Sequence, residues 1–417
     1  MRIKTSINPL RNYFALKPSD SFGNRAEEIF FALLKCRRGK KKLVLIKLKF
    51  NLFFKFKFRK GNFELFNVKH PIIVENPIIE FLNYFFSFIL SILRIFGFFL
   101  WKISNLMGYK INHIFIREGG GDFLVNRNSI WKKRMSWEKE FENKLNVAYG
   151  LRKFLYADFP ILEGNRYVCL HVRSGGFLDD FEARRFRNAN IENYIPAMKK
   201  LIDLGYLIVR LGDPSMPKIK MEGVIDYANH PKKSEKNDIL LIEHCDFYMG
   251  SQSGPIDVAG LFEKKILTLN CTSLSHCFWY RKGSLFIPRK SMIDGEILSL
   301  EEQIMYNLFE ADGSGLMNKE VSYIENSSEE ILEAVNEFIN FTELDSFQKY
   351  FNNVLEEQLL EYFQNKFYFS LNPTKDNVEK NRWISRIKNP KGSICKKYLE
   401  QNWSEVPLSK YNRKSKF

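Results

Sequence analysis

The chain has 417 residues, enough for two or three domains with a substantial core. Its apolar content of 45% is that of an ordinary globular protein, and 64 Lys and Arg against 48 Asp and Glu give a net charge of +16. This excess of basic residues favours an anionic partner, such as nucleic acid, a membrane surface or a phosphorylated substrate, without choosing between them.

The six cysteines argue against a disulfide framework. None of them belongs to a C-x-x-C pair, and Cys169 lies inside a run that we expect to be a buried strand. A reducing cytoplasm therefore fits better than an oxidising compartment. Cys271, His276 and Cys277 cluster, but no fourth ligand follows at a zinc-like spacing, so we expect no metal there.

Residues 1–110 form a basic and aromatic N-terminal region. No apolar segment of the secretory type follows the first basic residues. The run Lys41–Phe58 alternates in places, as at Phe54–Phe58, and predicts a strand or hairpin arm with one basic face. Gly61-Asn62 predicts a turn toward a second run at Phe63–Val68. Such a ribbon can lie on anionic lipid, bind nucleic acid or face solvent, and we favour lipid or solvent over nucleic acid.

The most apolar stretch of the chain is 81–100, which is about long enough to span a bilayer. Its polar residues are spaced three or four apart and would form one stripe on a helix: Glu80, Asn83, Ser87, Ser91 and Arg94. A charge near the middle of a span costs about 2.5–3.5 kcal/mol. We therefore expect a membrane-associated helix over 78–103 that lies in the interface of an anionic leaflet. A tilted span and a core helix of a soluble domain are the alternatives.

The middle of the chain carries weaker signals before a regular pattern begins. Gly119–Gly121 lacks the lysine and spacing of a P-loop, so we expect a turn, and Ser136–Tyr149 predicts a charged surface helix. Tyr167–Val172 is a short apolar run ending in a glycine-containing loop, the pattern of a buried strand.

Strands and helices alternate from there. Further strands are predicted at 206–211, 224–227, 247–249 and 265–269, and helices at 191–204, 236–245 and 255–262. This alternation predicts an α/β fold with a doubly wound parallel sheet. Later helices are predicted at 299–308, 327–341, 344–367 and 393–402, with a capping box formed by Ser327 and Glu330.

Two loops at predicted strand ends form a candidate anion site. Ligands of open α/β sheets bind outside the carboxyl ends of the strands. Arg173 follows the first strand and offers a permanent charge in a fork that suits phosphate. Gly250–Gly254 separates a strand from a helix opened by Pro255, so its backbone N–H groups can bind a phosphate, with Ser251 and Ser253 adding hydroxyl donors. Taken singly, the first loop can be a solvated arginine after a core strand and the second a turn with small residues for steric reasons. The two loops together favour a pyrophosphate clamp.

The sequences of both loops resemble motifs of known enzymes. H-V-R-S-G-G at His171–Gly176 resembles the H-x-R-x-G loop of fucosyltransferase-like glycosyltransferases of the GT-B type. Cys245–Gly254 resembles their second motif, in which a strand is followed by G-S-x-S.

Three further motifs resemble more closely a bacterial family of glycosyltransferases found with surface-polysaccharide genes. They are R-N-A-N-I at Arg187–Ile191, G-D-P-S-M at Gly212–Met216 and I-D-Y-A at Ile225–Ala228. The resemblance covers about residues 165–290. It implies a GT-B-like fold and a nucleotide-sugar donor whose diphosphate lies at Arg173 and Ser251–Gly254.

The resemblance also implies an organisation of the chain. Residues 166–310 would form a Rossmann-like nucleotide-sugar-binding domain, 111–165 a reduced or divergent acceptor-side region, and 311–417 a C-terminal helical region. The donor-binding residues would be Arg173, Ser174, Gly175, Gly212, Asp213, Ser251, Gln252, Ser253 and Gly254.

The chemistry implied is metal-independent transfer without a cofactor. No D-x-D motif accompanies the loops, so arginine and a helix dipole would stabilise the leaving diphosphate. A carboxylate or histidine must deprotonate the acceptor hydroxyl, and the candidates are His171, Asp179, Asp180 and Glu182. Members of the family often have Asp where this chain has Ser174, so that carboxylate role moves to one of the three acidic residues or is absent.

We therefore predict an inverting hexosyl- or deoxyhexosyltransferase at the cytoplasmic side of the inner membrane, peripheral or monotopic. Its acceptor would be a cell-surface glycan or a lipid-linked molecule. The alternative is a non-catalytic, membrane-tethered interaction protein with a degenerate transferase fold. A nucleic-acid binder using Lys41–Arg59 is a third interpretation, but no known module supports it, so we expect no nucleic-acid partner.

Overall fold

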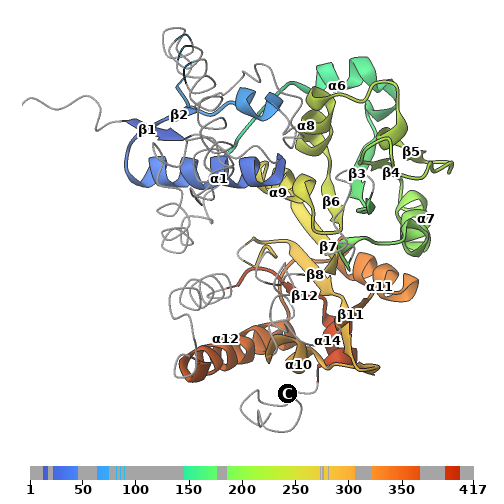
Figure 1. Cartoon of the computed structure of the whole chain (residues 1–417). Helices are drawn as coiled ribbons and strands as arrows, with labels where there is room; N and C mark the ends of the chain where they lie inside the picture. The colour runs from blue at the N-terminus through green and yellow to red at the C-terminus, as the bar shows by residue number, and fades with distance from the viewer. Residues whose placement is uncertain are drawn as a thin grey trace, which may run out of the picture. The chain divides into compact units, whose positions relative to one another are not determined.

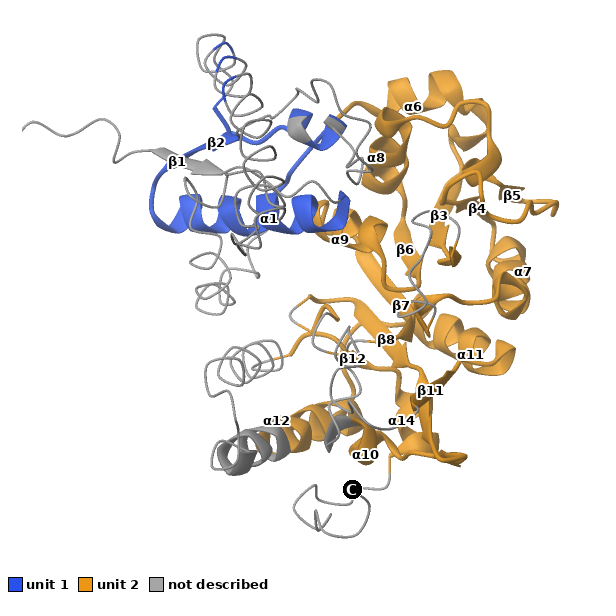
Figure 2. Cartoon of the chain, in the orientation of Figure 1, with its two compact units in different colours: residues 1–149 blue, residues 150–417 orange. Residues whose placement is uncertain are grey.

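The structure is a computed structural model that describes residues 13–16, 22–45, 63–74, 81, 85, 89, 145–175, 186–272, 274, 277–279, 281–305, 321–366 and 390–403. The chain divides into two compact units, residues 1–149 and 150–417, which we call unit 1 and unit 2 (Figure 2). The segment boundaries expected after residues 110, 165 and 310 do not coincide with this division, and the roles assigned to those segments stay predictions.

Unit 2 is built on a seven-stranded parallel sheet (Figure 1). Its strands are β3 (Arg166–His171), β4 (Tyr206–Arg210), β5 (Val224–Ile225), β6 (Phe247–Gly250), β7 (Lys265–Cys271), β8 (Ser284–Pro288) and β12 (Ser393–Ile394). Their order across the sheet is β12-β8-β7-β6-β3-β4-β5, with every neighbouring pair parallel. The predicted doubly wound parallel sheet is confirmed.

Helices cover both faces of this sheet. On one face lie α7 (Ile195–Asp203) and α11 (Ser328–Ile339), and on the other α8 (Glu235–His244) and α9 (Gly254–Leu261) (Figure 1). Residues 167–171 of β3 are consequently buried without a break instead of alternating between core and solvent. The helix α6 (Arg152–Asp158) packs against α8, and the 3-10 helices η4 (Pro160–Leu162), η7 (Ile191–Tyr194) and η8 (Tyr227–Asn229) complete this part.

The later part of unit 2 adds a small antiparallel sheet and more helices. The sheet has the order β10 (Glu296–Ile297), β9 (Lys290–Ile293), β11 (Val321–Ile324), and the helices are α10 (Leu300–Met305), α12 (Ser346–Lys366) and α14 (Lys396–Asn402). The Ser327–Glu330 capping box at the start of α11 is confirmed.

The predicted helix over 393–402 is wrong at its start. Ser393 and Ile394 form β12 and pair with Leu285 and Phe286 of β8, while the helix begins only at Lys396. Both strand residues are completely buried, and their backbone groups satisfy the edge of the sheet.

The described part of unit 1 contains a β-α-β arrangement. β1 (Tyr13–Leu16) and β2 (Lys42–Leu45) are parallel, and α1 (Phe22–Arg38) connects them. No element is predicted from the sequence for residues 22–38. One prediction for unit 1 is wrong, because Phe63–Asn67 is the 3-10 helix η2 rather than a strand, closed by a 2.8 Å bond from Asn67 Nδ2 to Glu64 Oε2.

Several predictions for unit 1 fall wholly or partly outside the described residues. They concern the ribbon at Lys41–Phe58, of which only the first residues are described and include the strand β2, the turns at Gly61-Asn62 and Gly119–Gly121, and most of the helices at 78–103 and 136–149. Residues 81, 85 and 89 are helical, whereas residues 145–149 are not. No helix among the described residues is long and apolar enough to cross a bilayer.

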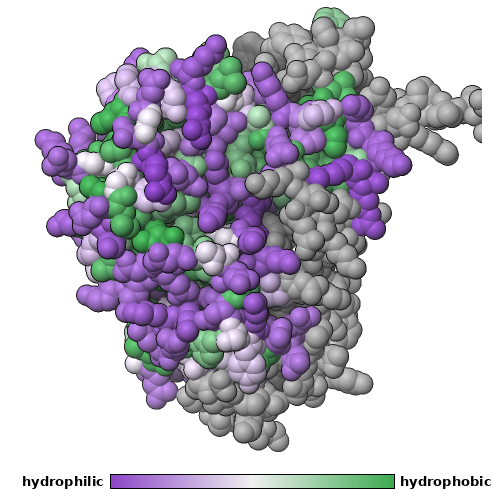
Figure 3. Space-filling model, turned by 180° about the vertical axis from the view of Figure 1, so that it is seen from behind, coloured by the Kyte–Doolittle hydropathy of each residue, from purple (hydrophilic) through white to green (hydrophobic). Residues whose placement is uncertain are grey.

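The surface of the described residues is mixed in character. Seen from behind, it is mostly hydrophilic, with small hydrophobic patches between the polar side chains (Figure 3). The large exposed apolar side chains include Leu151, Phe154 and Ile161 of unit 2. Scattered apolar residues of this kind are ordinary on protein surfaces and indicate no site by themselves.

Candidate functional site

The two candidate loops meet at the point where the strand order of the sheet reverses. From β3 the chain continues to β4 and β5 on one side, and then returns to place β6, β7 and β8 on the other. The carboxyl ends of β3 and β6 are therefore neighbours at a topological switch point, the place where open α/β sheets bind ligands.

Backbone and side-chain bonds join these loops directly. The N–H of Ser251 donates to the carbonyl of His171 at 2.9 Å, and the N–H of Arg173 donates to Oγ of Ser251 at the same distance. Ser251 is 1% exposed, so this hydroxyl is a fixed internal bond. Because this hydroxyl accepts from the N–H of Arg173, Arg173 and the Gly250–Gly254 loop lie side by side.

Gly250 is required by the close approach of the two strands. Its φ is +145°, and a Cβ there would lie 2.0 Å from the carbonyl oxygen of His171. No other residue type fits without moving the backbone of β3 or β6. The glycine therefore sets the spacing of the switch point.

His171 links β3 to the helix that follows β6. Its Nδ1 lies 2.8 Å from Oγ of Ser253, and its side chain is buried. Burial lowers the pKa of the imidazole to about 4, with the nearby positive charge of Arg210 acting in the same direction. The ring is consequently neutral at physiological pH and serves to hold the Ser253 loop, while its proposed role as a base stays a prediction.

The bond to His171 also changes what Ser253 does for α9. Ser253 is the N-cap residue of this helix, yet its hydroxyl makes no capping bond, and Pro255 occupies the first turn. Helix N-termini carry unsatisfied N–H groups and a partial positive charge. The start of α9 is therefore disposed to receive an anion next to Arg173.

Two arginines bracket this loop. Nη1 of Arg173 donates to Oδ1 of Asn188 at 2.6 Å, and Nη2 of Arg187 donates to the carbonyl of Gln252 at 2.7 Å. The segment that carries Arg187 and Asn188 is thus bonded to both halves of the switch point. Neither Arg187 nor Asn188 was among the predicted site residues.

Arg289 holds that segment from the end of β8. Its Nη1 donates to the carbonyl of Phe186 at 2.7 Å, and its Nη2 donates to the carbonyl of Asn188. Arg289 is 3% exposed, and burial lowers the pKa of its guanidinium from the ordinary value. Applying the strand-end rule to the run before Arg289 would have identified it, because it directly follows Pro288.

Gln252 anchors the tip of the loop to β7. Its Oε1 accepts from the N–H of Thr272 at 2.9 Å, and its Nε2 donates to Sγ of Cys277 at 3.5 Å. The Sγ of Cys277 donates to Sγ of Cys271 at 3.6 Å, and neither cysteine forms a disulfide. The side chain of Gln252 is therefore turned into the protein, and its predicted contact with the donor stays a prediction.

The loop after β4 is held by contacts between its own residues. Gly212 has a φ of +155°, and a Cβ there would lie 2.2 Å from Sδ of Met216. Oδ1 of Asp213 accepts from the N–H of Ser215 at 3.0 Å and also from its hydroxyl. The charge of Asp213 acts on His171, so the predicted Gly212 and Asp213 belong to the same end of the sheet.

The remaining predicted residues divide into two groups. Ser174 and Gly175 follow Arg173, and the buried Oγ of Ser174 has no hydrogen-bond partner among the described residues. Asp179, Asp180 and Glu182 lie outside the described residues, as does His276. The residues that the structure describes include no group of three or more metal-ligating side chains.

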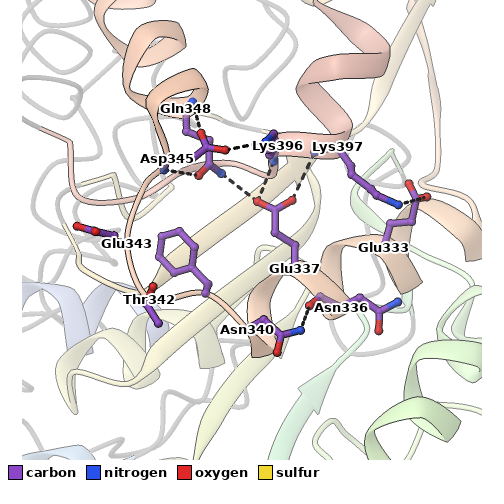
Figure 4. Close-up of a pocket in the computed structure, with 11 residues that line it drawn as sticks. Glu333, Asn336, Glu337, Asn340, Thr342, Glu343, Asp345, Gln348, Lys396 and Lys397 are labelled. Atoms are coloured by element: carbon purple, nitrogen blue, oxygen red, sulfur yellow. Dashed lines mark hydrogen bonds and ion pairs between the residues drawn. The ribbon is translucent and has the colours of Figure 1, made fainter.

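A pocket of about 440 Å³ lies elsewhere, between α11, α12 and α14 (Figure 4). Its polar groups bond to one another: Oε1 of Glu337 accepts from Nε2 of Gln348 at 2.9 Å and from the N–H of Lys396 at 2.8 Å. The other oxygen of Glu337 accepts from the N–H of Lys397, so this carboxyl group caps α14, and burial raises its pKa. None of the lining residues belongs to the loops at the switch point, so we place the functional site at the switch point.

Comparisons with known proteins give one structural neighbour. No protein-family model matches the chain, and no curated protein sequence matches it. The structure is similar to that of ADP-heptose LPS heptosyltransferase II of E. coli, with 12% identity and a TM-score of 0.40, covering 79% of this chain and 98% of the other. A likeness at this level assigns neither a family nor an activity to the chain.

Proposed function

We propose that unit 2 binds the diphosphate of a nucleotide-sugar at the switch point between β3 and β6, and that the protein is a glycosyltransferase. One observation carries this proposal: the backbone N–H of Arg173 bonds to Ser251, in the loop that leads to the uncapped start of α9, at the carboxyl edge of a parallel sheet. A cation and a helix N-terminus that converge in this way suit a phosphorylated ligand.

The same groups suit the departure of a nucleoside diphosphate. Negative charge develops on the leaving diphosphate as the bond between its oxygen and the anomeric carbon of the sugar breaks. A fixed guanidinium and a helix dipole stabilise that charge. We propose transfer without a metal and with inversion at the sugar. The acceptor hydroxyl must lose a proton, for which His171, Asp179, Asp180 and Glu182 are the candidate bases.

A membrane-linked acceptor, such as a glycan or a lipid-linked intermediate, is part of the proposal. Phe81 and Phe85 occupy helical positions four residues apart and are 68% and 51% exposed. Apolar side chains on one helix face, together with a net charge of +16, suit a peripheral position on an anionic cytoplasmic surface. Flotation with vesicles of phosphatidylglycerol, compared with phosphatidylcholine, tests this part.

Nucleotide binding is the first experiment. A metal-free thermal-shift panel of GDP, UDP, TDP, CMP and CDP is measured on the wild-type protein, Arg173→Ala and Arg166→Ala. Arg166 is a matched control, because it stands at the opposite end of β3 with a side chain that is 61% exposed. We expect a selective shift for wild type and Arg166→Ala that Arg173→Ala loses. An equal shift in Arg173→Ala would refute the proposed site.

A non-catalytic, membrane-tethered interaction protein is the second candidate. Ser174 favours it, because a serine with a buried, unpartnered Oγ among the described residues stands where the resembled enzymes often have an aspartate. Nucleotide binding without turnover of the matching nucleotide-sugars, over several acceptors, would support this candidate against the first.

A further inference from the structure

Two aromatic rings are stacked beside the candidate anion loop. The ring centroids of Phe186 and Tyr323 are 4.9 Å apart and their planes are inclined by 28°. Both residues are only half-buried. Phe186 immediately precedes Arg187, and Tyr323 lies on β11 opposite Ser291 of β9.

The position of Phe186 is fixed from two sides. Its carbonyl accepts the 2.7 Å bond from Nη1 of the buried Arg289, and the N–H of Ala189 donates to the carbonyl of Arg173 at 3.0 Å. The residues Phe186–Ala189 are thus tied to the end of β8 through Phe186 and to the loop after β3 through Ala189. Tyr323 supports the ring on one side, so the flat surface is held in place in advance of any ligand.

This flat surface is close to the proposed diphosphate contacts. Arg187, the next residue, bonds to the carbonyl of Gln252 in the loop before α9, and Asn188 bonds to the guanidinium of Arg173. A ligand whose phosphates occupy the switch point would therefore extend past these residues. Aromatic rings stack with planar bases of any sequence, because every base has a π-face.

We infer that Phe186 is the stacking surface for the nucleobase of the donor, with Tyr323 supporting the ring from behind. The inference rests on the proposed function, since it requires a nucleoside diphosphate at the switch point. It adds a base subsite to a site whose other residues we propose to contact phosphate. It also predicts that recognition by this surface depends on a flat ring rather than on apolar volume.

The test is isothermal titration calorimetry on the full chain with two probes, inorganic pyrophosphate and the nucleoside diphosphate selected by the thermal-shift panel. The variants are Phe186→Leu, which keeps apolar volume but removes the flat ring, and Phe186→Tyr, which keeps the ring. Tyr323→Leu is a second variant that removes the supporting ring. We expect Phe186→Leu to weaken binding of the nucleoside diphosphate by about tenfold and to leave binding of pyrophosphate unchanged. Phe186→Tyr should bind both probes as the wild type does.

The outcomes separate the two proposals. Equal weakening of both probes by Phe186→Leu and Tyr323→Leu would mean that the rings only support the arginine segment, and unchanged binding of both would mean that they do not face the ligand; either result overturns the inference and leaves the proposed function standing. A wild-type protein that binds neither probe would overturn both.

Discussion

Asn270 and Asn326 bind each other reciprocally: the N–H of Asn270 donates to Oδ1 of Asn326 at 2.6 Å, and the N–H of Asn326 donates to Oδ1 of Asn270 at 2.8 Å. Both residues are 1% exposed. The pair joins the end of β7 to the residue before the capping box of α11. Asn270 has a φ of +53°, a conformation that asparagine tolerates better than most residues.

Removing either side chain leaves a buried backbone N–H without its partner. We expect Asn326→Ala to lower the free energy of unfolding by about 1–3 kcal/mol. Asn270→Gly keeps the backbone conformation and removes the other half of the pair. A double-mutant cycle measured by urea unfolding should give a coupling energy of about 0.5–3 kcal/mol. Strict additivity of the two losses would contradict the reciprocal pair; the exposed Asn340→Ala is the control.

The depressed pKa of His171 makes stability depend on pH. The pKa falls from an ordinary value of 6.5 to about 4 through burial, so between these pH values the unfolded chain binds more protons than the folded one. Stability should therefore rise with pH from about pH 4 to 6.5, with a total contribution of about 3 kcal/mol. Urea unfolding measured at intervals across this pH range should show that the free energy of unfolding rises less steeply with pH in His171→Asn than in the wild type. An unchanged slope would argue against a buried neutral imidazole.

The switch point should not tolerate a side chain at Gly250. A Cβ there meets the carbonyl oxygen of His171 at 2.0 Å, whereas the same change at Gly295, also at positive φ, meets nothing within 4 Å. Gly295→Ala should lower the free energy of unfolding only by the backbone strain, about 1 kcal/mol, whereas Gly250→Ala should lower it clearly more. Thermal unfolding of the two variants side by side measures the difference. Equal costs would show that β3 and β6 separate easily.

Arg289 should affect ligand binding without touching the ligand. Lysine keeps the charge but lacks the planar fork that reaches the carbonyls of Phe186 and Asn188 together. We expect Arg289→Lys to weaken binding of both the nucleoside diphosphate and pyrophosphate by about tenfold, because Arg173 and Arg187 lose their fixed positions. Arg281→Lys is the control, since Arg281 bonds to the carbonyl of Gly260 away from the loops. Binding unchanged in Arg289→Lys would show that the segment keeps its place without the fork.

The strand and helix pattern of unit 2 was readable because short apolar runs ended at glycines and polar turns. That pattern located Arg173 and Gly250–Gly254 at strand ends, and the sheet brought them together. It did not locate Asn188, whose contact with Arg173 depends on the path of a loop. It also missed β12, since two residues leave no periodicity and the following sequence is helical.

The helix α1 was missed for a different reason. Its apolar residues have helical spacing at Ile29, Phe30, Leu33 and Leu34, but they lie within residues 1–40, a mixed and basic stretch without a clear periodicity over its whole length. Gly39, whose N–H donates to the carbonyl of Lys35 at 2.9 Å, is an ordinary helix stop signal and was available in the sequence.

The placement of β12 has a consequence for synthesis of the protein. β8 pairs on one side with β7, which the ribosome makes before it, and on the other with Ser393 and Ile394, which emerge much later. The N–H of Gly392 also donates to the carbonyl of Trp279, so closure of that side requires the late segment. Every nascent chain therefore passes through a period with β8 as an open hydrogen-bonding edge, when self-association competes with completion. A premature stop codon anywhere before Ser393 would make that exposed edge permanent.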